Sequence, residues 1–119
     1  MKTSPASIPV EKSTEAMIRL CPIDELVSGQ ARRFDVGNHG IAVVRIGDHV
    51  YAIGDRCTHQ NVSLSEGEVY AEDAEIECVR HGSTFSLATG EALSLPATKP
   101  TPVYRVEVID GDVHVAVGP

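Results

Sequence analysis

The stretch ECVRHGSTF, residues 77–85, places a cysteine and a histidine three positions apart, at Cys78 and His81. One thiolate and one imidazole do not complete a metal site, because the metals that proteins hold with these ligands usually take four. The complement lies upstream in CTH, which carries Cys57 and His59. The sequence therefore predicts one metal centre built from two loops, each giving one cysteine and one histidine.

Two kinds of metal group fit this ligand set. In a binuclear 2Fe–2S centre, Cys57 and Cys78 hold one iron while His59 and His81 hold the other. A structural zinc ion accepts the same four side chains in a tetrahedral arrangement. The Cys-x-His spacing of the first pair is tighter than the usual zinc spacing, which favours the iron–sulfur centre. Colour separates the two, since the zinc protein is colourless and the iron–sulfur protein is red-brown.

Composition limits the class of function. The chain has 119 residues, which suits one domain with its own core. Its 17 acidic and 10 basic side chains give a formal charge of −7, which argues against binding to nucleic acid or to an anionic membrane. There is no apolar run long enough to span a membrane, and the N-terminal stretch lacks the apolar centre of a secretory signal. We therefore expect a cytoplasmic protein.

The residue pattern favours strands. Aromatic residues make up only 4% of the chain and Trp is absent, so the core must be built from aliphatic side chains. Gly47 and Asp48 lie between two β-branched runs and predict a tight hairpin turn. Asp110 and Gly111 divide VYRVEVIDGDVHVAV, which alternates apolar and polar residues, and predict a second hairpin. One short helical turn is expected in PIDELVSG, with Asp24 as its N-cap.

The domain organisation follows from where the pattern changes. Residues 1–15 are rich in Ser, Thr, Pro and charge, and predict a disordered tail. Residues 16–119 are expected to form a single domain. Its base strands fall within residues 16–53 and 103–117. Residues 54–102 have weak periodicity and repeated Gly and Pro, so we interpret them as a loop-rich subdomain that holds both cysteine–histidine pairs.

Taken together, these stretches resemble the Rieske-type ferredoxins, small electron carriers of bacterial ring-hydroxylating oxygenase systems. The resemblance includes CTHQNVSLSEGEV, IECVRHGSTFSLATGEALSLPATKP and TPVYRVEVIDGDVHVAV, and so covers most of the folded part. It implies an all-β Rieske fold, with an antiparallel β-sandwich or barrel-like base and an inserted, loop-rich cluster-binding subdomain. It also implies one Rieske-type 2Fe–2S cluster, with Cys57 and Cys78 on the buried iron and His59 and His81 on the exposed iron.

Three further residues are expected around the cluster. Gly82 either lets the backbone approach a bridging sulfide or is an ordinary turn glycine. Ser83 either donates a hydrogen bond to a cluster sulfur or caps the turn. Pro96 lies in SLPATKP, which resembles the proline loop that covers the third side of the cluster in the family. Phe85 stands where high-potential members of the family have a tyrosine, so we expect a lower potential here.

The function that the resemblance implies is electron transfer, so the protein is not expected to be an enzyme. Its expected partners are a flavin-dependent NAD(P)H reductase as donor and a terminal non-haem iron oxygenase as acceptor, and it is expected to act as a monomer. Three alternatives stay open: a redox protein linked to iron–sulfur cluster assembly, the small subunit of an assimilatory nitrite reductase, and the structural zinc module. Electron-transfer assays with each class of acceptor, together with metal analysis, distinguish them.

Overall fold

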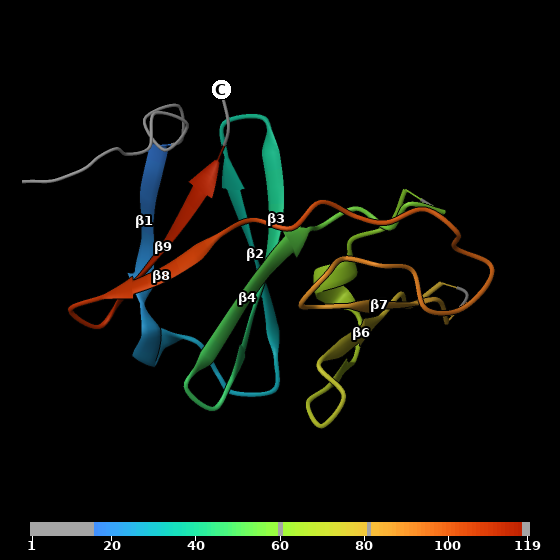
Figure 1. The fold of residues 1–119 in the computed structure, drawn as a ribbon, viewed down its shortest axis with the longest axis horizontal. Helices are drawn as coiled ribbons and strands as arrows, with labels where there is room; N and C mark the ends of the chain where they lie inside the picture. The colour runs from blue at the N-terminus through green and yellow to red at the C-terminus, as the bar shows by residue number, and fades with distance from the viewer. Residues whose placement is uncertain (1–15, 60, 81, 118–119) are drawn as a thin grey trace, which may run out of the picture.

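The fold is built from antiparallel sheets that follow one another along the chain. The computed structural model describes residues 16–59, 61–80 and 82–117, and the predicted disordered tail therefore lies outside the described residues. Within the described part there are three three-stranded sheets, and all their strand pairs are antiparallel. This arrangement confirms the predicted all-β class (Figure 1).

The first base sheet joins the two ends of the described chain. Its strand order is β1-β9-β8, with β1 at Ala16–Pro22, β8 at Val106–Ile109 and β9 at Asp112–Val117. Strands β8 and β9 form the predicted hairpin. The φ angles of Asp110 and Gly111 are 53° and 81°, and two positive φ angles are what a type I′ hairpin turn requires. The second hairpin prediction is therefore confirmed.

The second base sheet is a meander of consecutive strands. Strand β2 covers Ala31–Val36, β3 covers His39–Ile46 and β4 covers His49–Gly54, in the order β2-β3-β4. The β3–β4 turn falls at Gly47 and Asp48, as the sequence predicts. Because two-residue turns fix the register of the strands they join, the long β3 strand is placed firmly beside β4.

The helical content is small, and one detail of it was predicted wrongly. The turn expected near Asp24 is the 3-10 helix η2 at Ile23–Glu25. Its N-cap is Pro22, with no side-chain cap, and Asp24 lies inside the first turn. Strand β1 ends directly at the helix, which leaves no room for a separate capping residue at Asp24. In the described part of the chain, no helix is long and apolar enough to cross a membrane.

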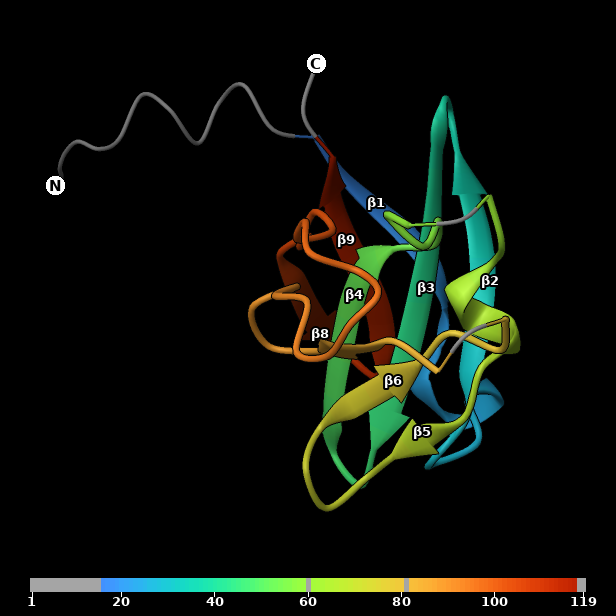
Figure 2. The ribbon, with the colours of Figure 1, turned by 90° about the vertical axis from the view of Figure 1, so that its right-hand side faces the viewer.

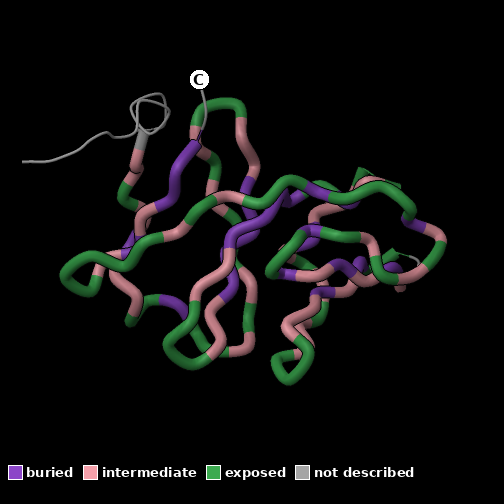
Figure 3. Tube along the Cα trace, in the orientation of Figure 1, coloured by how far each residue is buried: buried purple, intermediate pink, exposed green. Residues whose placement is uncertain are grey.

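Strand β3 is buried on both faces and separates two cores. Ile41 and Val43 pack into the core between the two base sheets, whereas Ala42 and Val44 pack into the core beneath the loop-rich region. All four side chains are fully buried. Successive residues of a strand point to opposite faces, so a single strand serves both cores. The loop-rich region is thus packed directly on a base strand. Figure 3 shows that buried positions occur in both halves of the molecule.

The third sheet is short and lies at the far side of the second base sheet. It contains β5 at Val69–Tyr70, β6 at Glu75–Glu77 and β7 at Thr84–Ser86, preceded by the 3-10 helix η3 at Leu64–Glu66. Figure 2 shows β5 and β6 facing the viewer, in front of β3 and β4. All these elements fall within residues 54–102, which we continue to interpret as the cluster-binding subdomain.

Candidate metal centre

The first ligand loop, residues 55–63, connects β4 to η3. Its backbone closes on itself where the amide of Cys57 donates to the carbonyl of Val62 at 2.9 Å. This turn directs the side chains of the predicted ligand pair to different surroundings. Cys57 is 2% exposed and belongs to the buried core, whereas His59 is exposed. The loop therefore presents a thiol on its inner side and an imidazole on its outer side.

The second ligand loop, residues 78–83, connects β6 to β7. The amide of Cys78 donates to the carbonyl of Ser83 at 2.7 Å, and the amide of Gly82 donates to the carbonyl of Cys78 at 3.1 Å. Gly82 has a φ of 79°, a left-handed conformation that glycine adopts without strain. Gly82 is thus a turn residue, and its approach to a sulfide stays a prediction. Cys78 is 2% exposed, and His81 lies outside the described residues.

The two loops are joined by tight backbone packing. Gly67 lies just after η3, and a Cβ atom at this position would be 1.7 Å from the carbonyl oxygen of Glu77. Glu77 directly precedes Cys78, and its amide donates to the carbonyl of Glu68 at 2.9 Å. The segment leaving the first loop is therefore in contact with the strand entering the second. Cys57 and Cys78 consequently belong to the same buried cluster of side chains.

A third segment contacts both loops. This proline segment, residues 94–100, accepts a hydrogen bond at the carbonyl of Lys99 from the hydroxyl of Thr58, at 2.7 Å. At its centre, the amide of Ala97 donates to the hydroxyl oxygen of Ser83 at 3.0 Å. The segment thus links the first loop to the second from outside. These contacts agree with the family pattern of a proline loop on the third side, and a contact of Pro96 with the cluster stays a prediction.

The surroundings of the two cysteines fit an iron–sulfur cluster. Two thiols are buried in an apolar core, and Ser83 beside them is 1% exposed. The Ser83 oxygen accepts from Ala97, so its own proton is available to a cluster sulfur. Phe85 is fully buried and offers no such proton. Within the described ranges no group of three possible metal ligands lies together, and the fourth predicted ligand, His81, is outside those ranges.

A hydrogen-bonded pair that the sequence analysis missed, Tyr70 and Glu77, lies beside the second ligand loop. The hydroxyl of Tyr70 donates to the carboxylate of Glu77, and this hydrogen bond raises the pKa of Tyr70 to about 12. The other carboxylate oxygen of Glu77 would lie 3.1 Å from a Cβ atom at Gly82. Glu77 therefore places negative charge next to the loop. Its position directly before Cys78 is the only sequence signal that could have indicated this role.

This geometry defines a class of protein. The sheet scaffold buries one cysteine from each of two loops and leaves a histidine of the first loop at the surface. Such a scaffold suits a mixed-ligand iron–sulfur cluster whose inner iron is shielded and whose outer iron is close to solvent. Cys57 and Cys78 thus lie in the same buried cluster of side chains, and His59 lies in the same loop as Cys57, while ligation by these residues stays a prediction.

The chain belongs to the Rieske [2Fe-2S] domain family, whose model matches residues 16–105. It holds one Rieske-type 2Fe–2S cluster, and not the structural zinc ion that the sequence analysis kept as an alternative. The chain is 44% identical over 98 residues to the 3-phenylpropionate/cinnamic acid dioxygenase ferredoxin subunit of Escherichia coli strain K12. That match covers 82% of this chain and 91% of the relative.

Solved structures of similar proteins have the same fold. The ferredoxin of carbazole 1,9a-dioxygenase from Nocardioides aromaticivorans IC177 superposes with a TM-score of 0.82 at 37% identity, covering 83% of this chain and 95% of that one. A ferredoxin in complex with the oxygenase of carbazole 1,9a-dioxygenase gives 0.78 at 42% identity, covering 84% and 92%. Both matches confirm the Rieske fold that the resemblance implied.

Proposed function

We propose that this chain is the ferredoxin component of a ring-hydroxylating dioxygenase system. It carries single electrons from a flavin-dependent NAD(P)H reductase to a terminal non-haem iron oxygenase, and itself performs no substrate chemistry. The observation that carries this proposal is the contrast within the first ligand loop, where Cys57 is buried and His59 is exposed. The similarity to dioxygenase ferredoxins, one of them in complex with its oxygenase, supports the choice of acceptor.

The proposed cysteine and histidine ligands have different roles in electron transfer. Cys57 and Cys78 hold the cluster against the buried core, where water is excluded and the surroundings are rigid. His59 and His81 are neutral ligands, so the outer iron accepts an electron more readily than it does with four thiolates. The bound cluster supplies a one-electron couple. With His59 at the surface, a partner can approach the reducible iron closely.

The partner interface is proposed to be small and short-lived. An electron carrier binds two proteins in turn and releases each, which suits an interface at the low end of the size range. Glu66 and Glu68 lie close to the first ligand loop and are exposed. On a chain with a formal charge of −7, they steer a basic acceptor surface towards the cluster end. We further propose that the protein acts as a monomer in the cytoplasm, where NAD(P)H supplies the reductase.

Reconstitution with a reductase and an oxygenase tests this function. Substrate hydroxylation that depends on the ferredoxin supports it. Electron delivery only to a cluster-assembly complex, or co-purification with a large sirohaem subunit, would favour one of the alternative functions instead. The transfer rate to the oxygenase should fall as salt rises, because the Debye length shrinks from about 10 Å at 0.1 M salt to about 3 Å at 1 M.

Charge reversal locates the docking surface. The double variant Glu66→Lys and Glu68→Lys should slow transfer to the oxygenase at low salt, and the difference from the wild-type rate should vanish at high salt. Asp24→Lys with Asp48→Lys provides the matched control, since both residues are exposed on the base. Equal slowing by the two double variants would show that total charge, and not the cluster end, governs docking.

A further inference from the structure

Asp55 is a buried acid between the base and the first ligand loop. Its side chain is only 3% exposed, and a buried carboxylate is costly unless its oxygens are satisfied. Oδ1 accepts a hydrogen bond from the amide of Ser65 at 2.8 Å. Oδ2 lies 3.4 Å from Nη1 of Arg33 on β2. The carboxylate therefore connects the helix that follows the loop to a strand of the base.

The backbone of Asp55 makes two further long-range contacts. Its amide donates to the carbonyl of Gly40 on β3 at 2.9 Å, and its carbonyl accepts from the amide of Leu64 at 2.5 Å. Asp55 thus fixes both the entry to the first ligand loop and its exit. Cys57 follows only two residues later, so little freedom is left between the fixed residue and the thiol.

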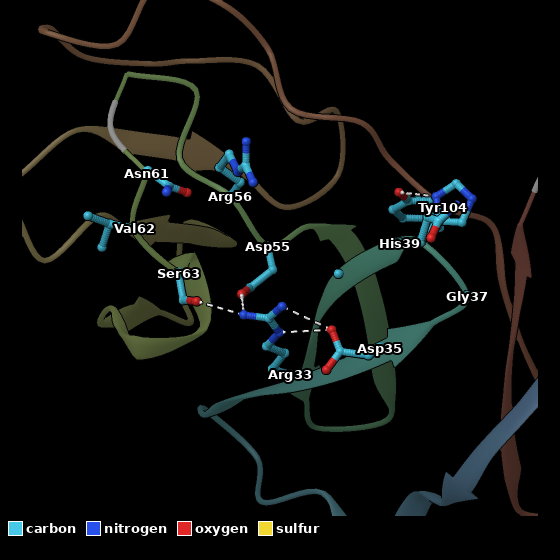
Figure 4. A pocket seen from close by; sticks show the side chains of 12 residues that line it. Arg33, Asp35, Gly37, His39, Asp55, Arg56, Asn61, Val62, Ser63 and Tyr104 are labelled. Atoms are coloured by element: carbon cyan, nitrogen blue, oxygen red, sulfur yellow. Dashed lines mark hydrogen bonds and ion pairs between the residues drawn. The ribbon is translucent and has the colours of Figure 1, made fainter.

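Arg33 is itself held in place. Its Nε and Nη2 donate to Oδ1 of Asp35 at 3.1 and 3.0 Å, and its Nη1 donates to the hydroxyl of Ser63 at 3.2 Å. Figure 4 shows the guanidinium between Asp35, Asp55 and Ser63, beside a cavity of about 620 Å³. Ser63 is the last residue of the ligand loop. Arg33 therefore contacts both ends of the loop, Asp55 at its start and Ser63 at its end.

We propose that Asp55 and Arg33 form a positioning pair that sets the geometry of the first ligand loop. Through this loop the pair controls how tightly the cluster is retained and how its outer iron is oriented. The inference rests on the proposed function in one respect, since it takes Cys57 and His59 as ligands. Neither Asp55 nor Arg33 is placed in contact with the cluster.

Asp35 offers a matched control within the same network. It binds the same guanidinium, yet its side chain is 66% exposed, and the hydrogen bonds and ion pairs found for it in the described structure do not reach the ligand loop. An exposed ion pair contributes little to stability, whereas removing one partner of a buried charge has a large effect. Asp35→Asn and Asp55→Asn each remove one carboxylate from Arg33, but only the second changes the loop.

The experiment compares the cluster-loaded wild type with Asp55→Asn, Arg33→Gln and Asp35→Asn. We expect Arg33→Gln, which leaves the buried Asp55 carboxylate without its guanidinium, to lose iron to a chelator about tenfold faster than the wild type. Asp55→Asn removes that charge and keeps an oxygen that accepts from the amide of Ser65, so it should lose iron at an intermediate rate. Asp35→Asn should stay within about twofold. The paramagnetic spectrum of the reduced cluster should broaden or shift in Asp55→Asn and not in Asp35→Asn. The double variant of Arg33 and Asp55 should resemble Asp55→Asn, because the two residues act together.

Two results would overturn the positioning role. One is wild-type iron loss and an unchanged spectrum in both Asp55→Asn and Arg33→Gln. The other is an equal effect of Asp35→Asn and Asp55→Asn, which would reflect charge alone. Failure of the proposed function looks different, because the wild type would then lack the Rieske spectrum or transfer no electrons to an oxygenase. Amide hydrogen exchange at Ser65, faster in Asp55→Asn than in Asp35→Asn, tests the pair in either case.

Discussion

The two ligand loops offer the same pair of ligand types, yet they are held in different ways. The second loop is closed by hydrogen bonds between its own backbone atoms, at Cys78, Gly82 and Ser83. Among its described residues the first loop has one such bond, between Cys57 and Val62, and Asp55 and Arg33 attach the loop to the base. Equivalent ligands can therefore be held mainly by hydrogen bonds within the loop in one case and by contacts with the base in the other.

The largest expected effect tests whether both loops are ligand loops. His59→Ala and His81→Ala should each abolish the Rieske paramagnetic spectrum, because an iron loses a ligand. His→Cys at either position should retain a cluster in part of the protein, with a potential shifted towards the value of about −400 mV found for all-cysteine plant-type centres. His114→Ala, on β9 of the base, should leave the spectrum unchanged. A normal spectrum in His59→Ala would show that His59 of the first loop is not a ligand.

A second prediction concerns the packing that joins the loops. Gly67→Ala would bring a Cβ atom to 1.7 Å from the carbonyl oxygen of Glu77, so the backbone must shift. We expect a loss of about 3 kcal/mol in the free energy of unfolding, measured by denaturant titration. Gly37→Ala serves as the control, because its Cβ would meet no atom within 4 Å and only its φ of +60° is strained. The control should lose about 1 kcal/mol.

A third prediction concerns the hydroxyl of Ser83 in the second ligand loop and its effect on the reduction potential. Ser83→Ala should lower the reduction potential, because a hydrogen bond to a cluster sulfur stabilises the extra electron. The shift should be small compared with the span of about −150 to +300 mV that Rieske centres cover. Ser86→Ala at the end of the neighbouring strand β7, whose hydroxyl accepts from the amide of Thr89, is the matched control. If voltammetry gives equal potentials for the two variants, the Ser83 hydroxyl binds only the amide of Ala97 and makes no hydrogen bond to the cluster.

The smallest expected effect is a titration next to the second loop. The hydrogen bond to Glu77 raises the pKa of Tyr70 from 10.0 to about 12, so folding favours the protonated phenol. The stabilising contribution is complete below pH 10 and is lost as the pH rises from about 10 to about 12. Absorbance titration should show one tyrosine ionising near pH 12, absent in Tyr70→Phe. In Glu77→Gln it should ionise closer to 10.

Local features of the fold could be predicted from the sequence. The hairpins at Gly47 and Gly111 follow from turn chemistry that involves only neighbouring residues. The paired spacing of cysteine and histidine is likewise local, and it led to the family and its cluster. Ligation by Cys57, His59, Cys78 and His81 stays a prediction, and His81 lies outside the described residues.

Long-range features could not be predicted. Arg33 and Asp55 meet because β2 and β4 both pair with β3, and this register emerges only from the assembled sheet. In the sequence Arg33 is one charged residue among many on an exposed strand face. The two-sided burial of β3 was also missed, because an apolar run such as GIAVV does not reveal which side chains enter which core.

The pairing of β1 with β9 has a practical consequence. Ala16 pairs with Val117, so the two ends of the described chain are neighbours in one sheet. Figure 1 shows this sheet on the side of the molecule away from β6 and β7. Adjacent ends permit circular permutation, for example with new ends at the exposed Gly47–Asp48 turn. They also allow the protein to be fused to a reductase, or fixed to an electrode, through either end while His59 still faces the solution.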